Sequence, residues 1–163
     1  MRIGVVADTH SQKLPLQMLK DFQGVDLIVH AGDFCSLKDL EVLSDIKELK
    51  GVYGNMDDAA IIKRLPRRQI FPLGLFQIGL FHGEGPPKTI LKVVQEEFRD
   101  DRVDVVIFGH SHQPLNQRIH NVLYFNPGSP TDRVNAPYRS YGLLTITDNA
   151  YSGQLIKVKE TDG

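Results

Sequence analysis

Seven residues of types that can bind metal ions stand at the ends of five apolar runs in this chain of 163 residues. They are Asp8, His10, Asp33, Asn55, His82, His110 and His112. Short apolar runs of this kind are typical of buried β-strands, and strands of one sheet end along a common edge, where open α/β sheets place their sites. We therefore expect the seven side chains to meet in space. A set of oxygen and nitrogen ligands without thiolates suits two divalent cations such as Mn²⁺, Fe or Zn²⁺.

Each of these residues also has a structural interpretation when it is taken alone. Asp8 and Asn55 could form turns, Asp33 could lie near a helix N-terminus, and His82 could be a structural histidine. His110 and its partner His112 could occupy a surface loop. The agreement among all seven favours the metal site, because burying that many polar groups without partners would cost several kcal/mol each.

The two closest pairs have different expected roles. Asp8 and His10 are two positions apart, so in an extended segment their side chains would point the same way and could bind one ion. His110 and His112 need not bind the same ion. The other two histidines of the chain, His30 and His120, are expected to be structural or exposed.

Two adjacent cations suit the hydrolysis of a phosphate ester. Metal ions about 3.5–4 Å apart bind the phosphate oxygens and lower the pKa of a bridging water from 15.7 towards about 7. In-line attack by the resulting hydroxide then needs mainly positioning and charge stabilisation. The turn Asn126-Pro127-Gly128-Ser129 could contact a substrate through its backbone N–H groups or the Ser129 hydroxyl. Arg133 is a further residue that could contact the substrate. An ordinary Pro-Gly turn is the equally good alternative.

The elements that must position these residues alternate between strand and helix in the first half of the chain, and the second half is rich in strands. Strands are expected at 3–7, 27–29, 52–53, 75–81, 103–108, 122–125, 142–147 and 154–159, with helices near 14–22, 37–46, 59–65 and 89–98. Residues 70–81 predict a hairpin that turns near Gly74. No repeat or linker interrupts the pattern, so we expect one domain over residues 1–163, an α/β fold with two packed sheets and flanking helices.

Composition limits the partners only weakly. The net charge is −1, so nothing in the total charge favours a membrane surface or nucleic acid, although nucleic acid is retained as a possible substrate. The single cysteine, Cys35, excludes an internal disulfide and fits a reducing compartment. No apolar run reaches membrane length, and we expect a cytoplasmic protein.

The motifs occur in the order found in calcineurin-like metallophosphoesterases, which the chain resembles over nearly its whole length. Within that family the chain most resembles the compact YfcE/MJ0936-type phosphodiesterases. The features that it shares with them are its small size and the motifs Asp8-Thr9-His10-Ser11, Gly109-His110-Ser111-His112 and Asn126-Pro127-Gly128-Ser129. Those enzymes are similar in fold to the retromer subunit Vps29. The resemblance implies a sandwich of two mixed β-sheets flanked by helices, in four layers, with a site for two metal ions.

The resemblance also implies a role for each ligand. Asp8, His10 and His112 would hold the first ion, Asn55, His82 and His110 would hold the second, and Asp33 would bridge the two. The expected cofactor is a pair of Mn²⁺ ions, with Fe, Zn²⁺ or Ni²⁺ as alternatives. The expected activity is that of a phosphodiesterase on a small phosphate ester, with a phosphomonoesterase or a non-catalytic Vps29-like scaffold as the alternatives. Assembly into a homo-oligomer is left open.

One position departs from the family pattern. Many members carry a histidine directly after the ligand asparagine, where it is thought to protonate the leaving group, and this chain has Met56 there. Methionine cannot donate a proton, so we expect a slow enzyme or one that prefers good leaving groups. Asn55 and Asp57 are therefore the candidate catalytic residues of this segment, with Asp57 expected to orient the site through hydrogen bonds.

Overall fold

Two five-stranded mixed sheets form the centre of the protein in the computed structural model, which describes residues 1–161. The first sheet has the order β10-β9-β1-β2-β3. Its strands are β1 (Arg2–Val6), β2 (Leu27–His30), β3 (Leu49–Gly51), β9 (Ser140–Ile146) and β10 (Tyr151–Lys157). β1, β2 and β3 are parallel, whereas β9 runs antiparallel to both β1 and β10.

The second sheet has the order β4-β5-β6-β8-β7. Its strands are β4 (Arg68–Leu73), β5 (Phe76–Phe81), β6 (Val105–Ile107), β7 (Leu115–Ile119) and β8 (Val122–Asn126). The central three, β5, β6 and β8, are parallel, and the two outer strands pair antiparallel. The expected hairpin is confirmed as β4 and β5, which turn at residues 74–75.

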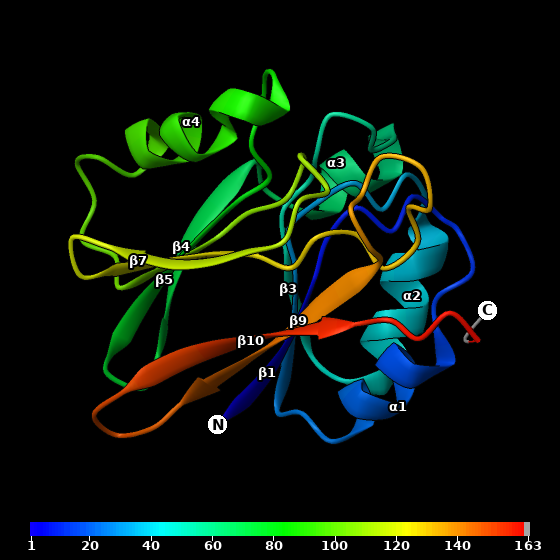
Figure 1. Cartoon of the computed structure of the whole chain (residues 1–163), viewed down its shortest axis with the longest axis horizontal. Helices are drawn as coiled ribbons and strands as arrows, with labels where there is room; N and C mark the ends of the chain where they lie inside the picture. The colour runs from blue at the N-terminus through cyan, green and yellow to red at the C-terminus, as the bar shows by residue number, and fades with distance from the viewer. Residues whose placement is uncertain (162–163) are drawn as a thin grey trace.

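Helices cover the outer faces of both sheets, as Figure 1 shows. The helices are α1 (Leu16–Gln23), α2 (Leu37–Ile46), α3 (Ala59–Arg64) and α4 (Ile90–Glu97), and α4 follows a short 3₁₀ turn at Pro87–Thr89. α1 and α2 lie against the first sheet, and α4 lies over the second (Figure 1). The expected arrangement of two mixed sheets with flanking helices is therefore confirmed.

Apolar side chains fill all three spaces between the layers. The inner faces of the two sheets meet in one cluster, in which Val5 and Val29 of the first sheet face Leu80 and Ile107 of the second. Met18 and Phe22 of α1 pack on the outer face of the first sheet, and the apolar side of α4 packs on the second. Because the parallel strands are covered on both faces, they are almost wholly apolar, and their polar residues begin where the strands end.

Two strand predictions were wrong. The third strand is β3 at Leu49–Gly51, not residues 52–53, and the strand β7 at Leu115–Ile119 was missed. Both are edge strands, and β7 is largely exposed, so neither carries the apolar run that marks a strand buried on two faces. Within residues 1–161, the helices are all too short or too polar to cross a bilayer.

Candidate metal centre

The structure brings all seven predicted ligands together at the carboxyl ends of five parallel strands. Asp8 follows β1, Asp33 follows β2, Asn55 follows β3, His82 follows β5, and the His110 loop follows β6. His10 and His112, which are 102 positions apart in sequence, approach to 3.2 Å between their Nε2 atoms. The side-chain oxygen of Asn55 lies 3.1 Å from Nε2 of His82 and 3.1 Å from Nδ1 of His110. The convergence inferred from strand ends is therefore present in the fold.

Two buried carboxylates lie between the histidines. Oδ1 of Asp8 is 3.4 Å from Nε2 of His112 and 3.8 Å from Nε2 of His82. Oδ2 of Asp33 is 3.3 Å from Nε2 of His82 and 3.7 Å from Nε2 of His10. Each carboxylate therefore faces histidines of both expected ion sites. Two groups have the spacing of a metal site, Asp8 with His10 and His112, and Asp8 with Asp33 and His82.

One carboxylate oxygen of this cluster has no hydrogen-bond donor, although it lies 3.4–3.8 Å from three histidine rings. Oδ1 of Asp8 is fully buried and accepts no hydrogen bond from residues 1–161. Burying a carboxylate oxygen without a hydrogen-bond donor is costly, and a divalent cation would neutralise its charge. The donor set of carboxylate, imidazole and amide groups also suits such cations. The residues present therefore fit the two metal ions that the sequence predicts.

Hydrogen bonds outside the cluster fix the tautomers of two histidines. Nδ1 of His82 donates to the carbonyl of Ala31 over 2.7 Å, which leaves Nε2 as its free ligand atom. Nε2 of His110 donates to the carbonyl of Gly85 over 2.8 Å, so His110 presents Nδ1 instead. Because a metal-binding nitrogen must carry a lone pair, these outer contacts prepare each ring for coordination.

The electrostatics of the cluster favour positive charge. Burial lowers the pKa of His82, but the carboxylates of Asp33 and Asp8 outweigh this effect and raise the pKa to about 9. Burial acts in the same way on His112, and there the carboxylates of Asp8 and Asp132 raise the pKa to about 9. The buried carboxylates therefore favour positive charge beside them. Protonated histidine rings supply that charge here, and bound metal ions would supply it in their place.

Five of the seven residues have left-handed backbone conformations. Positive φ angles occur at Asp8 (55°), His10 (51°), Asp33 (62°), His110 (70°) and His112 (56°). The expectation that Asp8 and His10 share an extended segment was therefore wrong, although both side chains do reach the cluster. Such conformations are unfavourable for residues with a Cβ and persist only where the surrounding structure enforces them, as it often does at functional sites.

Glycines before the ligands let the loops approach closely. A Cβ added at Gly54 would lie 2.2 Å from Oδ1 of Asp33, and one at Gly109 would lie 2.8 Å from Oδ2 of Asp8. Both distances are far shorter than a van der Waals contact. The Gly-Asn and Gly-His pairs of the sequence thus reflect packing of one ligand loop against the carboxylate of another.

The side chain of Asp57 connects the loop that carries Asp33 with the loop that carries Asn55. Its carboxylate accepts hydrogen bonds from the backbone N–H groups of Asp33 (3.0 Å), Cys35 (2.7 Å) and Gly54 (2.7 Å). Burial raises the pKa of Asp57, and these three N–H groups act in the opposite direction. A buried acid that holds the backbone of a ligand is placed to orient the site, which is the part predicted for Asp57.

Sequence reasoning missed two neighbours of the ligands. Oδ2 of Asp132 lies 2.5 Å from Nδ1 of His112, and Sγ of Cys35 lies 3.2 Å from Nδ1 of His10. Burial and the nearby carboxylates, Asp33 first, raise the pKa of the Cys35 thiol to about 11. Asp132 stands in an irregular polar segment with no strand end beside it, so its sequence carries no signal of this role.

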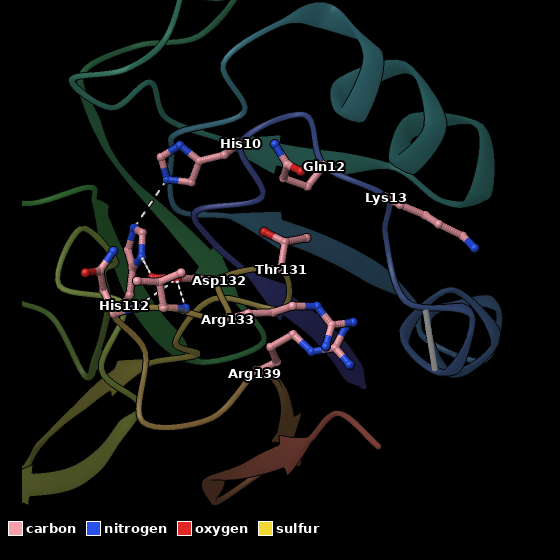
Figure 2. Close-up of a pocket in the computed structure, with 10 residues that line it drawn as sticks. His10, Gln12, Lys13, His112, Thr131, Asp132, Arg133 and Arg139 are labelled. Atoms are coloured by element: carbon pink, nitrogen blue, oxygen red, sulfur yellow. Dashed lines mark hydrogen bonds and ion pairs between the residues drawn. The ribbon is translucent and has the colours of Figure 1, made fainter. Parts of the chain in front are cut away.

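The two residues expected to contact substrate differ in their surroundings. Ser129 is fully buried, and its hydroxyl donates to the carbonyl of Asp8 over 2.8 Å while accepting from the N–H of Asp132. This side chain therefore ties the Asp132 segment to the Asp8 loop. Arg133 is exposed and lines a cavity next to His10 and His112 (Figure 2).

The other histidines lie away from the cluster or outside its ligand set. His30 is fully buried, stacks on Phe34 and hydrogen-bonds Thr9, and burial holds its pKa well below the usual value. His120 is exposed in the turn between β7 and β8. Met56, at the departure from the family pattern, has a side chain 56% exposed and a backbone N–H that donates to Oδ1 of Asp33.

The comparison with known families agrees with this geometry. The sequence pattern of the calcineurin-like phosphoesterase superfamily domain matches residues 1–149. The chain belongs to the calcineurin-like phosphoesterase superfamily. All seven predicted ligand positions lie within the matched residues.

Individual relatives are similar over most of their length. The probable metallophosphoesterase MJ0623 of Methanocaldococcus jannaschii is 34% identical, over 98% of this chain and 83% of that protein. The phosphodiesterase MJ0936 of the same organism is 25% identical, over 78% of this chain and 83% of its own length. The crystal structure of Vps29 from Chaetomium thermophilum matches 100% of this chain and 94% of that one, with a TM-score of 0.83 at 21% identity. The superfamily and the Vps29-like fold predicted from the sequence are thus confirmed.

Proposed function

We propose that this protein is a phosphodiesterase that depends on two divalent metal ions. The observation that carries the proposal is the meeting of seven oxygen and nitrogen ligands around a buried carboxylate oxygen of Asp8 that accepts no hydrogen bond from the described residues. A site that only stabilised the fold would not need five ligands in unfavourable backbone conformations.

Each ligand has a proposed place. Asp8, His10 and His112 would hold one ion, and Asn55, His82 and His110 would hold the other. Asp33 would contact both, in agreement with its position between His82 and His10. When bound, two such cations supply charge for the phosphate oxygens and activate the attacking water. Mn²⁺ is the metal we expect, with Fe, Zn²⁺ or Ni²⁺ as alternatives.

The chain itself supplies orientation and charge. Asp57 fixes the backbone of Asp33 and Gly54, and Asp132 fixes the ring of His112. Asn55 contributes its amide oxygen, and Arg133 lies on the cavity wall where it can meet an anionic substrate. Catalysis in such a site rests on preorganised positions more than on mobile side chains.

A diester with a good leaving group is the favoured substrate. The phosphodiesterase MJ0936 is among the relatives of the chain. Met56 offers no proton to a departing alkoxide, so substrates whose leaving groups are already stable anions should react fastest. Hydrolysis of phosphate monoesters is the second candidate activity.

A non-catalytic scaffold is the rival function, because solved structures of Vps29 share the fold. Retention of the complete ligand set, with both carboxylates buried, favours catalysis. The scaffold requires only the surface of this fold and gives no reason for a buried Asp8 oxygen that accepts no hydrogen bond.

The test is hydrolysis of bis(p-nitrophenyl) phosphate by purified protein loaded with Mn²⁺, beside p-nitrophenyl phosphate as the monoester. We expect the diester to be cleaved faster. Asp33→Ala should lower the rate by more than the ~10–100-fold typical of changes beside a metal site, with little loss of stability because no core volume is removed. His120→Ala, an exposed histidine outside the cluster, is the matched control.

Three outcomes would change the proposal. Faster cleavage of the monoester would make the protein a phosphatase. A protein that binds none of the four metals and leaves both substrates intact would be a scaffold. If His120→Ala lowered the rate of hydrolysis as much as Asp33→Ala, the assignment of His120 to the residues outside the site would be wrong.

A further inference from the structure

A cavity of about 510 Å³ opens directly beside the metal centre. His10 and His112, two of the ligands, form one wall, and residues 131–135 with Arg139 form another (Figure 2). Gln12 and Lys13 complete the lining next to His10. A diester whose phosphorus lies at the metal centre would therefore extend one of its two arms into this cavity.

The charge of the lining is opposite to that of the whole chain. Lys13, Arg133 and Arg139 are positive and Asp132 is negative, whereas the protein has a net charge of −1. In Figure 2 the side chains of Arg133 and Arg139 extend into the same part of the cavity, with Lys13 beyond Gln12. Cations gathered in a concave wall raise the local concentration of anions.

The one acid in this lining is already engaged. Oδ2 of Asp132 contacts His112, and Oδ1 accepts from the backbone N–H groups of Val134 (2.8 Å) and Asn135 (3.0 Å). By contrast, the side chains of Lys13 and Arg133 make no hydrogen bond or ion pair with any residue from 1 to 161. Both cations are therefore available to a ligand.

We propose that this cavity, defined by Lys13, Arg133 and Arg139 and called here the cationic subsite, binds a second phosphate group carried on one arm of the diester. The inference rests on the proposed function and specifies its substrate class: short diesters with an additional phosphate, such as a dinucleotide phosphorylated at its 5′ end. The volume falls in the range of about 300–1,000 Å³ that small-molecule sites occupy, so one nucleotide can be accommodated. The exposed side chain of Val134 gives the lining an apolar contact for a sugar or base.

A matched pair of substrates tests the subsite. The diadenosine dinucleotide with a 5′ phosphate and the same dinucleotide with a 5′ hydroxyl contain the same scissile bond. We expect kcat/KM to be at least about tenfold higher for the phosphorylated one, the effect of one charge-assisted hydrogen bond. The ratio of the two kcat/KM values should fall at least about fivefold in Arg133→Ala and in Lys13→Ala.

Lys92→Ala is the control, because Lys92 is an exposed lysine on α4, over the other sheet. Its ratio should equal that of the unmodified protein. A ratio near one in the unmodified protein, or a ratio that Arg133→Ala and Lys13→Ala leave unchanged, would overturn the inference. An equal fall in Lys92→Ala would also overturn it, since the effect would then be general attraction by surface charge.

A binding measurement separates this inference from catalysis. Metal-free protein is titrated calorimetrically with adenosine 5′-monophosphate and, separately, with adenosine. We expect the nucleotide to bind and the nucleoside not to bind, with an affinity that weakens as salt is added and weakens at least about fivefold in Arg133→Ala. Equal binding of both compounds, or no binding of either, would count against the subsite.

The two experiments fail in different ways. If no diester is hydrolysed but the nucleotide binds in an Arg133-dependent manner, the proposed activity is wrong and the anion site is correct. If bis(p-nitrophenyl) phosphate is hydrolysed but the ratio for the dinucleotides is near one, the activity is correct and the subsite is wrong.

Discussion

Nδ1 of His112 donates a hydrogen bond to Oδ2 of Asp132 over 2.5 Å. Asp132 lies in a different loop, 20 residues further along the chain. The contact fixes the ring so that Nε2 faces Asp8 and His10. It also stabilises positive charge on His112, whose pKa is about 9, and helps to bring the pKa of Asp132 down to about 2. A carboxylate behind a metal-binding histidine raises the basicity of the ligand and sets its orientation.

Removal of that charge should weaken the metal site. Asp132→Asn keeps a hydrogen-bond acceptor but loses the negative charge, so we expect metal affinity and diester hydrolysis to fall by about 10–100-fold. Calorimetric titration with Mn²⁺ measures the affinity, and the pKa of His112 followed by NMR in the metal-free protein should fall together with it. An unchanged His112 pKa would show that Asp132 acts only by shaping its own loop, through its hydrogen bonds from Val134 and Asn135.

Gly54→Ala should distort the centre without touching a ligand. The added Cβ would lie 2.2 Å from Oδ1 of Asp33 and 2.8 Å from the ring of His82, so one loop must move. Because productive sites tolerate displacements of only about 0.5 Å, we expect activity to fall at least about 100-fold. Circular dichroism should show retained secondary structure. Gly24→Ala, where the added Cβ would lie 3.6 Å from the nearest heavy atom in ordinary van der Waals contact, is the comparison for a glycine away from the centre.

Metal affinity should rise with pH. In the metal-free protein His82 and His112 have pKa values of about 9, so at neutral pH both hold protons that a metal ion must displace. Apparent affinity is therefore lowest near pH 6, increases as pH approaches 9 and levels off above that value. Titrations at pH 7.5 in two buffers of different ionisation enthalpy should show release of about two protons per protein. Binding that is independent of pH from 6 to 9 would contradict the proposed roles of both rings.

Met56→His should accelerate the cleavage of poor leaving groups. A histidine at this exposed position next to Asn55 can act as a general acid, which typically contributes about 10²–10⁴-fold. We expect an increase of at least about 100-fold on dialkyl phosphodiesters, the lower end of that range, and little change on bis(p-nitrophenyl) phosphate. Met56→Gln, which cannot supply a proton at neutral pH, is the control. If histidine and glutamine behave alike, protonation does not limit this enzyme.

Much of the centre could be read from the sequence because its ligands obey a local rule. Asp8, Asp33, Asn55, His82 and His110 each follow a short strand that is apolar or lies beside apolar residues, and parallel strands end on one edge. Residue type and strand position were sufficient to predict that these groups meet. The same apolar runs predicted two covered sheets, since only strands buried on both faces lack polar alternation.

Tertiary structure determined the features that have no local signal. The edge strand β7 is polar because it is exposed, and it was recognised only by its pairing with β8. The left-handed conformations of Asp8 and His10 are imposed by contacts with other loops, such as the hydrogen bonds from their N–H groups to Gly32 and Asp33. No spacing rule within one segment could reveal them.

Residue chemistry at strand ends thus specified which groups form the centre of this protein, because strand burial and ligand type are both written locally. The fold alone decided how those groups are held and what lies beside them. Asp132 reaches His112, Asp57 reaches the Asp33 loop, and Lys13 and Arg133 line the same cavity, because loops distant in sequence share one edge of the sandwich. Such contacts depend on the packing of whole layers, and a single chain segment carries no record of its neighbours in another layer.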